Sequence, residues 1–190
     1  MGSSGAAGSV GVSGGGTTSG GGTTSSAGAP AGGSKGTAGS GGATTTTACD
    51  TAPGLVWKTA NKTNFESYPA PGSAECIEFN GCAYEGQFAT CDGTFSLDFV
   101  KTHNIVAAFP LKPLSLHDLC LKKGDKTIVV TVYDTCGDSD CNGCCTKNKG
   151  SQDELIDVEK YTDQRWGVAD GVIQWADLGP TKGTSCAEAK

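Results

Sequence analysis

The sequence contains very little arginine and no long apolar run, and both absences exclude classes of function. Arg165 is the single arginine among 14 basic residues, and 20 acidic residues leave a net charge of −6. Nucleic-acid binders need clustered lysine and arginine to displace counterions from phosphates. The longest apolar stretch, residues 128–132, is far shorter than the roughly 20 residues that cross a bilayer. We therefore expect no nucleic-acid partner and no transmembrane segment.

Residues 1–48 lack aromatic side chains altogether and consist almost entirely of Gly, Ser, Thr and Ala. Such a segment cannot bury enough apolar surface to offset the entropy lost on ordering, which predicts a disordered low-complexity linker. Every aromatic residue lies further along the chain. Residues 49–190 are long enough for one hydrophobic core, and we expect one domain there.

Cysteine, by contrast, is abundant, with 10 residues in the chain. An even number in a small domain is typical of a disulfide framework and an oxidising compartment. The sequence does not fix the pairing, although Cys49 and Cys186 bracket the domain and suggest a bridge between its ends. A zinc site is the alternative, with candidate ligands at Cys136, Cys141, Cys144 and Cys145. Structural zinc sites usually pair two short knuckles, and the second is missing, so we expect no metal.

An oxidising compartment implies export, yet the residues after Met1 show neither a basic start nor an apolar core of a signal peptide. We expect that a leader has been removed and that the protein is extracellular or on the cell surface. The Gly/Ser/Thr-rich segment would then be a tether to a surface anchor, or an inert tail. Its composition fits a bacterial surface protein.

Hydrophobic periodicity predicts a mainly β domain with one short helix. The expected elements are strands at residues 85–91, 104–109, 126–134 and 171–176, a helix at residues 157–166, and an irregular arm at residues 50–75. Asp157 stands where a helix N-cap would. Several strands in so short a domain favour a small closed barrel, because closure removes exposed sheet edges.

Four segments, taken in order, resemble expansins and their relatives. VTVYDTC at residues 130–136 is similar to the Val-Thr-Val-x-Asp-x-Cys strand of that family, and LIDV at residues 155–158 resembles its His-Phe-Asp-Leu segment. GVIQW at residues 171–175 resembles the closing strand, and GQFATCDG at residues 86–93 the start of the barrel. The resemblance implies a six-stranded double-psi β-barrel, as in expansins, barwin-like proteins, family-45 endoglucanases and rare-lipoprotein-A-like proteins.

The resemblance also implies a site, with Asp157 as the acid and Asp134 beside it. A protonated carboxyl can give its proton to a glycosidic oxygen, and hydrolysis with inversion needs a second carboxylate about 6.5–9.5 Å away. Two carboxylates in one groove push their pKa values apart, so that one stays protonated near neutrality. The simpler alternatives are an N-cap for Asp157 and a turn residue for Asp134.

Two departures weaken a hydrolytic interpretation. The family's histidine beside the acid is replaced by Leu155, and the nearest candidate for the base is Asp92, which Gly93 follows as in an ordinary turn. Expansins have the acid but lack the base, and they bind and loosen polysaccharide without hydrolysing it. Thr90 and Tyr133 are predicted to hydrogen-bond sugar hydroxyls.

Exposed aromatic rings are the remaining feature expected of a sugar-binding groove. The candidates are Tyr84, Phe88, Trp166 and Trp175. Trp166 and Trp175 are included in the predicted substrate-binding set, although the core is the alternative place for each of the four. Asp134, Asp138 and Asp140 do not have the spacing of an EF-hand, so calcium is not expected.

We therefore predict a secreted, monomeric, expansin-like protein that binds and loosens or remodels cell-wall polysaccharide without a cofactor. The polymer is cellulose or another β-glucan, xylan or peptidoglycan. One alternative is an enzyme with Asp157 as the acid, either a family-45-like endoglucanase or a peptidoglycan lytic transglycosylase. The other is a barwin-like carbohydrate-recognition or defence protein.

Overall fold

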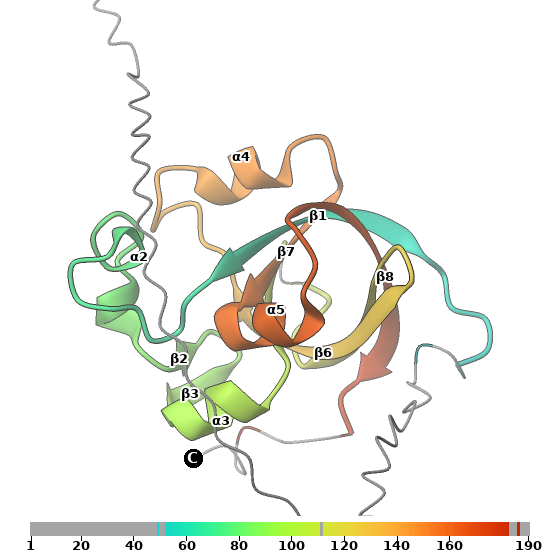
Figure 1. Ribbon diagram of the computed structural model, residues 1–190, viewed down its shortest axis with the longest axis horizontal. Helices are drawn as coiled ribbons and strands as arrows, with labels where there is room; N and C mark the ends of the chain where they lie inside the picture. The colour runs from blue at the N-terminus through green and yellow to red at the C-terminus, as the bar shows by residue number, and fades with distance from the viewer. Residues whose placement is uncertain (1–48, 50–51, 111, 183–185, 187–190) are drawn as a thin grey trace, which may run out of the picture. The chain divides into compact units, whose positions relative to one another are not determined.

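A computed structural model describes residues 49, 52–110, 112–182 and 186 (Figure 1). These residues all belong to one compact unit. The linker predicted at residues 1–48 lies outside the described part of the chain. No helix among the described residues is long and apolar enough to cross a membrane.

Six strands form a closed barrel, which confirms the predicted fold class. They are β1 (Lys58–Phe65), β4 (Ile105–Phe109), β5 (His117–Lys123), β6 (Lys126–Thr135), β7 (Glu154–Glu159) and β8 (Gly171–Pro180). Their order around the barrel is β1-β7-β4-β6-β5-β8. The pairs β1–β7 and β4–β6 are parallel, and the other pairs are antiparallel. Closure leaves no barrel strand with an unpaired edge.

Short elements surround the barrel. They are the two-stranded sheet β2 (Gln87–Phe88) and β3 (Cys91–Thr94), the 3₁₀ helix η1 (Gly81–Tyr84), and the helices α2 (Ala74–Ile77), α3 (Leu97–Thr102), α4 (Cys144–Lys149) and α5 (Lys160–Trp166). In Figure 1 helix α5 lies over the opening of the barrel. The segment resembling the start of the barrel, residues 86–93, therefore lies largely in the small separate sheet, and β1 is the first barrel strand.

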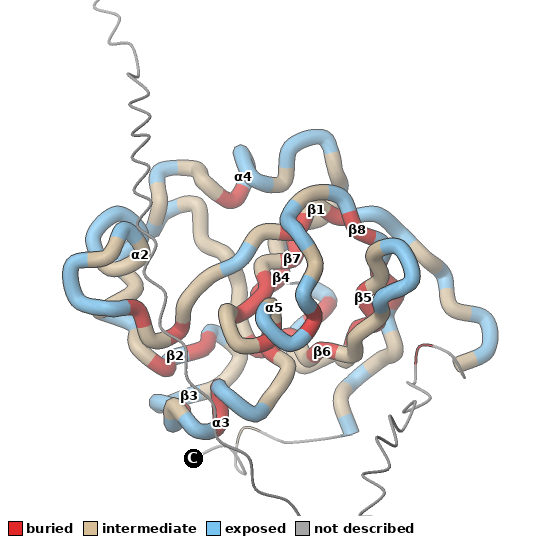
Figure 2. Tube along the Cα trace, in the orientation of Figure 1, coloured by how far each residue is buried: buried red, intermediate tan, exposed pale blue. Residues whose placement is uncertain are grey.

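The inside of the barrel is a hydrophobic core to which every barrel strand contributes (Figure 2). Trp166 and Trp175 belong to this core and are only 4% and 1% exposed. Their prediction as sugar-binding residues is wrong, because a ring buried on both faces cannot stack on a sugar. A second cluster packs Phe88, Phe95 and Phe99 against Tyr133 on the outer side of β6.

Five disulfides join the ten cysteines, and none among the described residues is free. The pairs are Cys49–Cys120, Cys76–Cys82, Cys91–Cys186, Cys136–Cys145 and Cys141–Cys144. The expected bridge between Cys49 and Cys186 is wrong, since each is joined to a cysteine far inside the chain. The four candidate zinc ligands are close together, but as two disulfides.

Three predicted elements differ from the structure. Of the strand expected at residues 85–91, only Gln87–Phe88 and the first residue of β3, Cys91, are extended. Strand β1 lies inside the segment expected to be an irregular arm, because its pairing with β7 and β8, rather than its own composition, makes it a strand. The helix expected from Asp157 begins at Lys160, with Glu159 as its N-cap, since the Glu159 side chain accepts a hydrogen bond from the Tyr161 N–H at 2.7 Å. Asp157 is a residue of strand β7.

Candidate functional site

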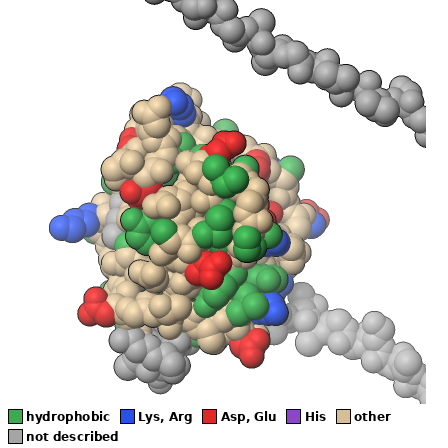
Figure 3. All heavy atoms as spheres, turned by 90° about the vertical axis from the view of Figure 1, so that its left-hand side faces the viewer, with side chains coloured by type: hydrophobic (Ala, Val, Ile, Leu, Met, Phe, Trp, Pro, Cys, Tyr) green, Lys and Arg blue, Asp and Glu red, His purple; other side chains and the backbone are tan. Residues whose placement is uncertain are grey.

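A groove of about 530 Å³ opens on the outer side of the barrel. Strands β4, β6 and β7 form its floor, while β2, β3 and the α2–η1 segment contribute to its walls. Hydrophobic and acidic side chains are mixed on this side of the molecule (Figure 3). Both aspartates that the sequence singled out, Asp134 and Asp157, line the groove.

The two aspartates are held by a row of paired residues across four neighbouring strands. Thr63 on β1 pairs with Asp157 on β7, and Asp157 pairs with Ala107 on β4. Ala107 in turn pairs with Asp134 on β6. The two carboxylates are therefore two strand spacings apart, about 10 Å between Cα atoms. The small side chain of Ala107 lies between them and leaves the floor of the groove open.

A β-bulge on β6 puts Asp134 in this row. Val106 pairs with Val132, but the next residue, Ala107, pairs with Asp134, so that Tyr133 is an extra residue on β6. Strict alternation would send Asp134 to the same side as Val132, which lies in the core inside the barrel. The bulge turns Asp134 to the outer face, where Asp157 also lies.

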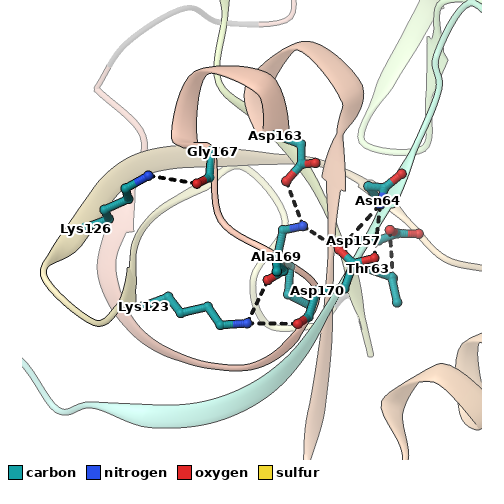
Figure 4. A network of polar contacts seen from close by, with 10 residues as sticks. Thr63, Asn64, Lys123, Lys126, Asp157, Asp163, Gly167, Ala169 and Asp170 are labelled. Carbon is teal, nitrogen blue, oxygen red and sulfur yellow. Dashed lines mark hydrogen bonds and ion pairs between the residues drawn. The ribbon is translucent and has the colours of Figure 1, made fainter. Parts of the chain in front are cut away.

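Asp157 is a partly buried acid with one hydrogen-bond partner. The Thr63 hydroxyl donates to Asp157 Oδ1 at 2.8 Å (Figure 4). Burial raises the pKa of Asp157 to about 7, and the charges of Glu75 and Asp170 add to this, against the hydrogen bond from Thr63 and the charge of Lys62. The carboxyl thus holds a proton in mildly acidic solution, and Oδ2 is the oxygen left to carry it.

Asp134 is held in a different manner. Its Oδ1 accepts hydrogen bonds from the backbone N–H groups of Ala89, at 2.9 Å, and Thr135, at 2.8 Å. Burial raises its pKa, and these two hydrogen bonds oppose the change. The contacts fix the carboxyl group between β6 and the segment leading to β3. Asp134 is therefore positioned by backbone groups alone and is not paired with a basic side chain.

The other predicted site residues are divided between the groove and the interior. Asp92 is exposed on β3 and lines the groove. Thr90 uses its hydroxyl to donate to the Tyr133 carbonyl at 2.6 Å, and Tyr133 is only 2% exposed within the outer aromatic cluster. Neither Thr90 nor Tyr133 lines the groove, so both support its wall from behind.

Several groove residues were not found from the sequence. They are the acids Glu66 and Glu75, the hydroxyl residue Ser67, and the ring of Phe79. The Cys76–Cys82 bridge closes a loop that includes Phe79, and the next segment carries Tyr84. A short cysteine-closed loop carrying a phenylalanine is the one sequence signal that could have indicated this wall.

No family model matches the chain, and no curated protein is significantly similar to it in sequence. The resemblance to expansins therefore rests on the four quoted sequence segments.

Proposed function

We propose that the groove binds a polysaccharide and that the protonated carboxyl of Asp157 donates a hydrogen bond to a glycosidic oxygen without breaking the bond, so that the protein loosens or remodels glycan. The observation that carries this proposal is the partly buried Asp157 carboxyl, with a pKa of about 7, on the floor of an open groove. A general acid works best when its pKa is near the ambient pH. The expansin-like segments of the sequence support the same function.

The apolar wall of the groove suits a sugar ring. Tyr84 and Phe79 line the groove and are 51% and 38% exposed, and Ile77 nearby is 72% exposed. Sugar rings present apolar C–H faces, and an exposed aromatic ring is a flat apolar surface on which such a face can stack. Tyr84 is therefore the aromatic ring on which a sugar would stack, a role for which Trp166 and Trp175 were also predicted from the sequence.

Hydrolysis with inversion is a second candidate, favoured by the position of Asp134. Both carboxyl groups line the same groove from strands two spacings apart, about 10 Å between Cα atoms, with only Ala107 between them. Inverting enzymes leave room for a water between carboxyl groups about 6.5–9.5 Å apart. In this reaction Asp134 would accept a proton from the attacking water while Asp157 protonates the leaving oxygen.

The five disulfides support an oxidising, extracytoplasmic place of action, because such bridges are rare in reducing compartments. Cell-wall polysaccharide is accessible there.

Products released from insoluble glycans test both functions. The full chain would be incubated with cellulose, xylan, chitin and peptidoglycan, and bound protein and soluble products measured by sedimentation and mass spectrometry. Asp157→Asn should abolish remodelling, and wild-type activity should fall as the pH rises through about 7, because the donor loses its proton. Asp125→Asn, in the exposed turn between β5 and β6, is the control.

The two functions differ at Asp134. Soluble oligosaccharides that disappear in Asp134→Asn would favour inverting hydrolysis. Binding and loosening without soluble products, insensitive to Asp134→Asn, would favour the expansin-like function. Full activity of Asp157→Asn would contradict both.

A further inference from the structure

Among the residues that the structure describes, acidic side chains line the groove and no basic one does. Its carboxyl groups belong to Glu66, Glu75, Asp92, Asp134, Asp140 and Asp157, and no Lys, Arg or His is among its lining residues. Lys160 pairs with Glu66 at 3.0 Å, but its side chain is 40% exposed and is not part of the lining. Lys62 is close in sequence to the groove residue Phe65, but its ammonium group forms ion pairs with Asp163 and Asp170. Apart from Glu66, the carboxyl groups that line the groove therefore have no ion-pair partner among the described residues.

A second observation points to a ligand independently of this charge. Ser67 lines the groove, is only 7% exposed, and its Oγ has no hydrogen-bond partner among the described residues. A buried hydroxyl without a partner is unfavourable, and native structures rarely retain one without a reason. A ligand group that donates or accepts a hydrogen bond in the groove would satisfy it.

The charge and the apolar wall together restrict the ligand. Uncompensated carboxylates repel an anionic polymer and attract a cationic one. Burial raises the pKa of Glu75, as it does for Asp134 and Asp157, so a cationic ligand group close to these carboxyls would favour their charged forms. Tyr84 and Phe79 at the wall favour a ring-shaped unit over a linear polyamine. A sugar that carries an ammonium group satisfies both conditions.

We propose that the groove selects a polysaccharide with free amino groups, of the glucosamine-polymer class that includes deacetylated chitin, over neutral and acidic polysaccharides. The proposal rests on the groove being a glycan-binding site, as inferred above. An ammonium group meets a carboxylate in charge-assisted hydrogen bonds, which are stronger than the neutral bonds a hydroxyl can make. Acetylation of the amine removes the charge and should remove the preference.

Binding of matched hexasaccharides to the full chain tests the proposal. Calorimetry would compare β-1,4-linked hexamers of glucosamine, N-acetylglucosamine and glucose with a hexagalacturonate, in low and in high salt at one pH. We expect the glucosamine hexamer to bind at least about tenfold more tightly than the neutral hexamers, which corresponds to one charge-assisted contact. The hexagalacturonate should not bind.

Two double variants separate groove charge from net charge. Glu75→Gln with Asp140→Asn removes two acids from the groove, and Asp125→Asn with Asp153→Asn removes two exposed acids outside its lining. The first should lose most of the preference for glucosamine, and the second should keep it. Equal losses in both would overturn the proposal, because attraction to net charge alone would then explain the binding.

The remaining outcomes distinguish this proposal from the one on which it rests. Groove-dependent binding of neutral hexamers with no preference for glucosamine would overturn the amine selectivity and leave the polysaccharide site intact. Failure of every hexamer and every insoluble glycan to bind would overturn both.

Discussion

Lys62 and Thr63 are neighbours on β1, and they serve two carboxylate sites of opposite character (Figure 4). Lys62 is fully buried, and its Nζ lies 2.6 Å from both Asp163 and Asp170. Although burial alone would raise the pKa of Asp170, its hydrogen bonds from Lys62 and Asn64 and the nearby lysine charges bring it below the usual value. Thr63 offers Asp157 only a hydroxyl, and the pKa of Asp157 rises to about 7.

Side chains alternate between the two faces of a strand, so the neighbours Lys62 and Thr63 lie on opposite sides of β1 and have different roles. Lys62 joins β1 to α5 and to the loop before β8 through its ion pairs with Asp163 and Asp170. Thr63 points the other way, toward a groove where the carboxyl lacks a cationic partner. A charge that is paired contributes to structure, whereas an unpaired and partly buried one costs stability and is typical of reactive sites.

The largest expected effect is at the paired site. Lys62→Met removes the buried cation between Asp163 and Asp170, whose side chains are 26% and 53% exposed. Two charge-assisted hydrogen bonds are lost, and solvation of the exposed carboxylates offsets part of the loss, so the free energy of unfolding should fall by about 2–4 kcal/mol. Urea denaturation measures it. Lys58→Met, which breaks an ion pair with Glu154 at 3.8 Å through a side chain 55% exposed, is the control and should cost less than about 1 kcal/mol. Equal losses would show that the buried pair has no special role.

The unpaired site should respond in the opposite direction. The pKa of Asp157 is higher in the folded protein, so the native state binds more protons than the unfolded state between about pH 4 and 7, and stability falls as the pH rises. Asp157→Asn can still accept from Thr63 and removes the charge. It should stabilise the protein by about 2–4 kcal/mol at pH 8 and by almost nothing at pH 4. A pH-independent effect would contradict the assignment.

Thr63→Val should give the smallest effect. The hydroxyl lowers the pKa of Asp157, so its loss should move the alkaline limb of the activity profile to higher pH by about 0.7 unit, the equivalent of one hydrogen bond. Thr131→Val removes a similar bond to Asp118, of 2.6 Å, outside the groove. This control should not move the limb, and a shift common to both variants would assign the effect to general destabilisation.

Parts of this arrangement could be predicted from the sequence because they follow local patterns. Strands β6 and β8 carry apolar residues at alternate or neighbouring positions, and their segments were predicted within a few residues. Strand β1 was missed, because the side chains it buries are those of Ala60 and Lys62, which carry no apolar pattern. Its place depends on pairing with β7 and β8, whose paired residues lie between 94 (Ala60 to Glu154) and 117 (Lys58 to Trp175) positions later in the chain.

The candidate site, too, could be predicted only in part from the sequence. The family-like segments indicated Asp157 and Asp134, and both line the groove, but an alternating pattern on β6 would have put Asp134 inside the barrel. Periodicity does not reveal a bulge. Nor does it distinguish a tryptophan inside a barrel from one in a groove, since both positions are flanked by similar residues. Trp166 and Trp175 were misplaced for that reason.

The disulfide pairing has a mechanical consequence. If the domain is pulled between Cys49 and Cys186, the load does not pass through all the intervening residues. It crosses to Cys120, runs back along the chain to Cys91, and crosses again to Cys186, so that only about 29 residues bear tension. Their full extension is about 100 Å. Strands β1, β6, β7 and β8 lie outside this path, whereas β4, the strand between β6 and β7 in the groove floor, lies within it and bears the tension.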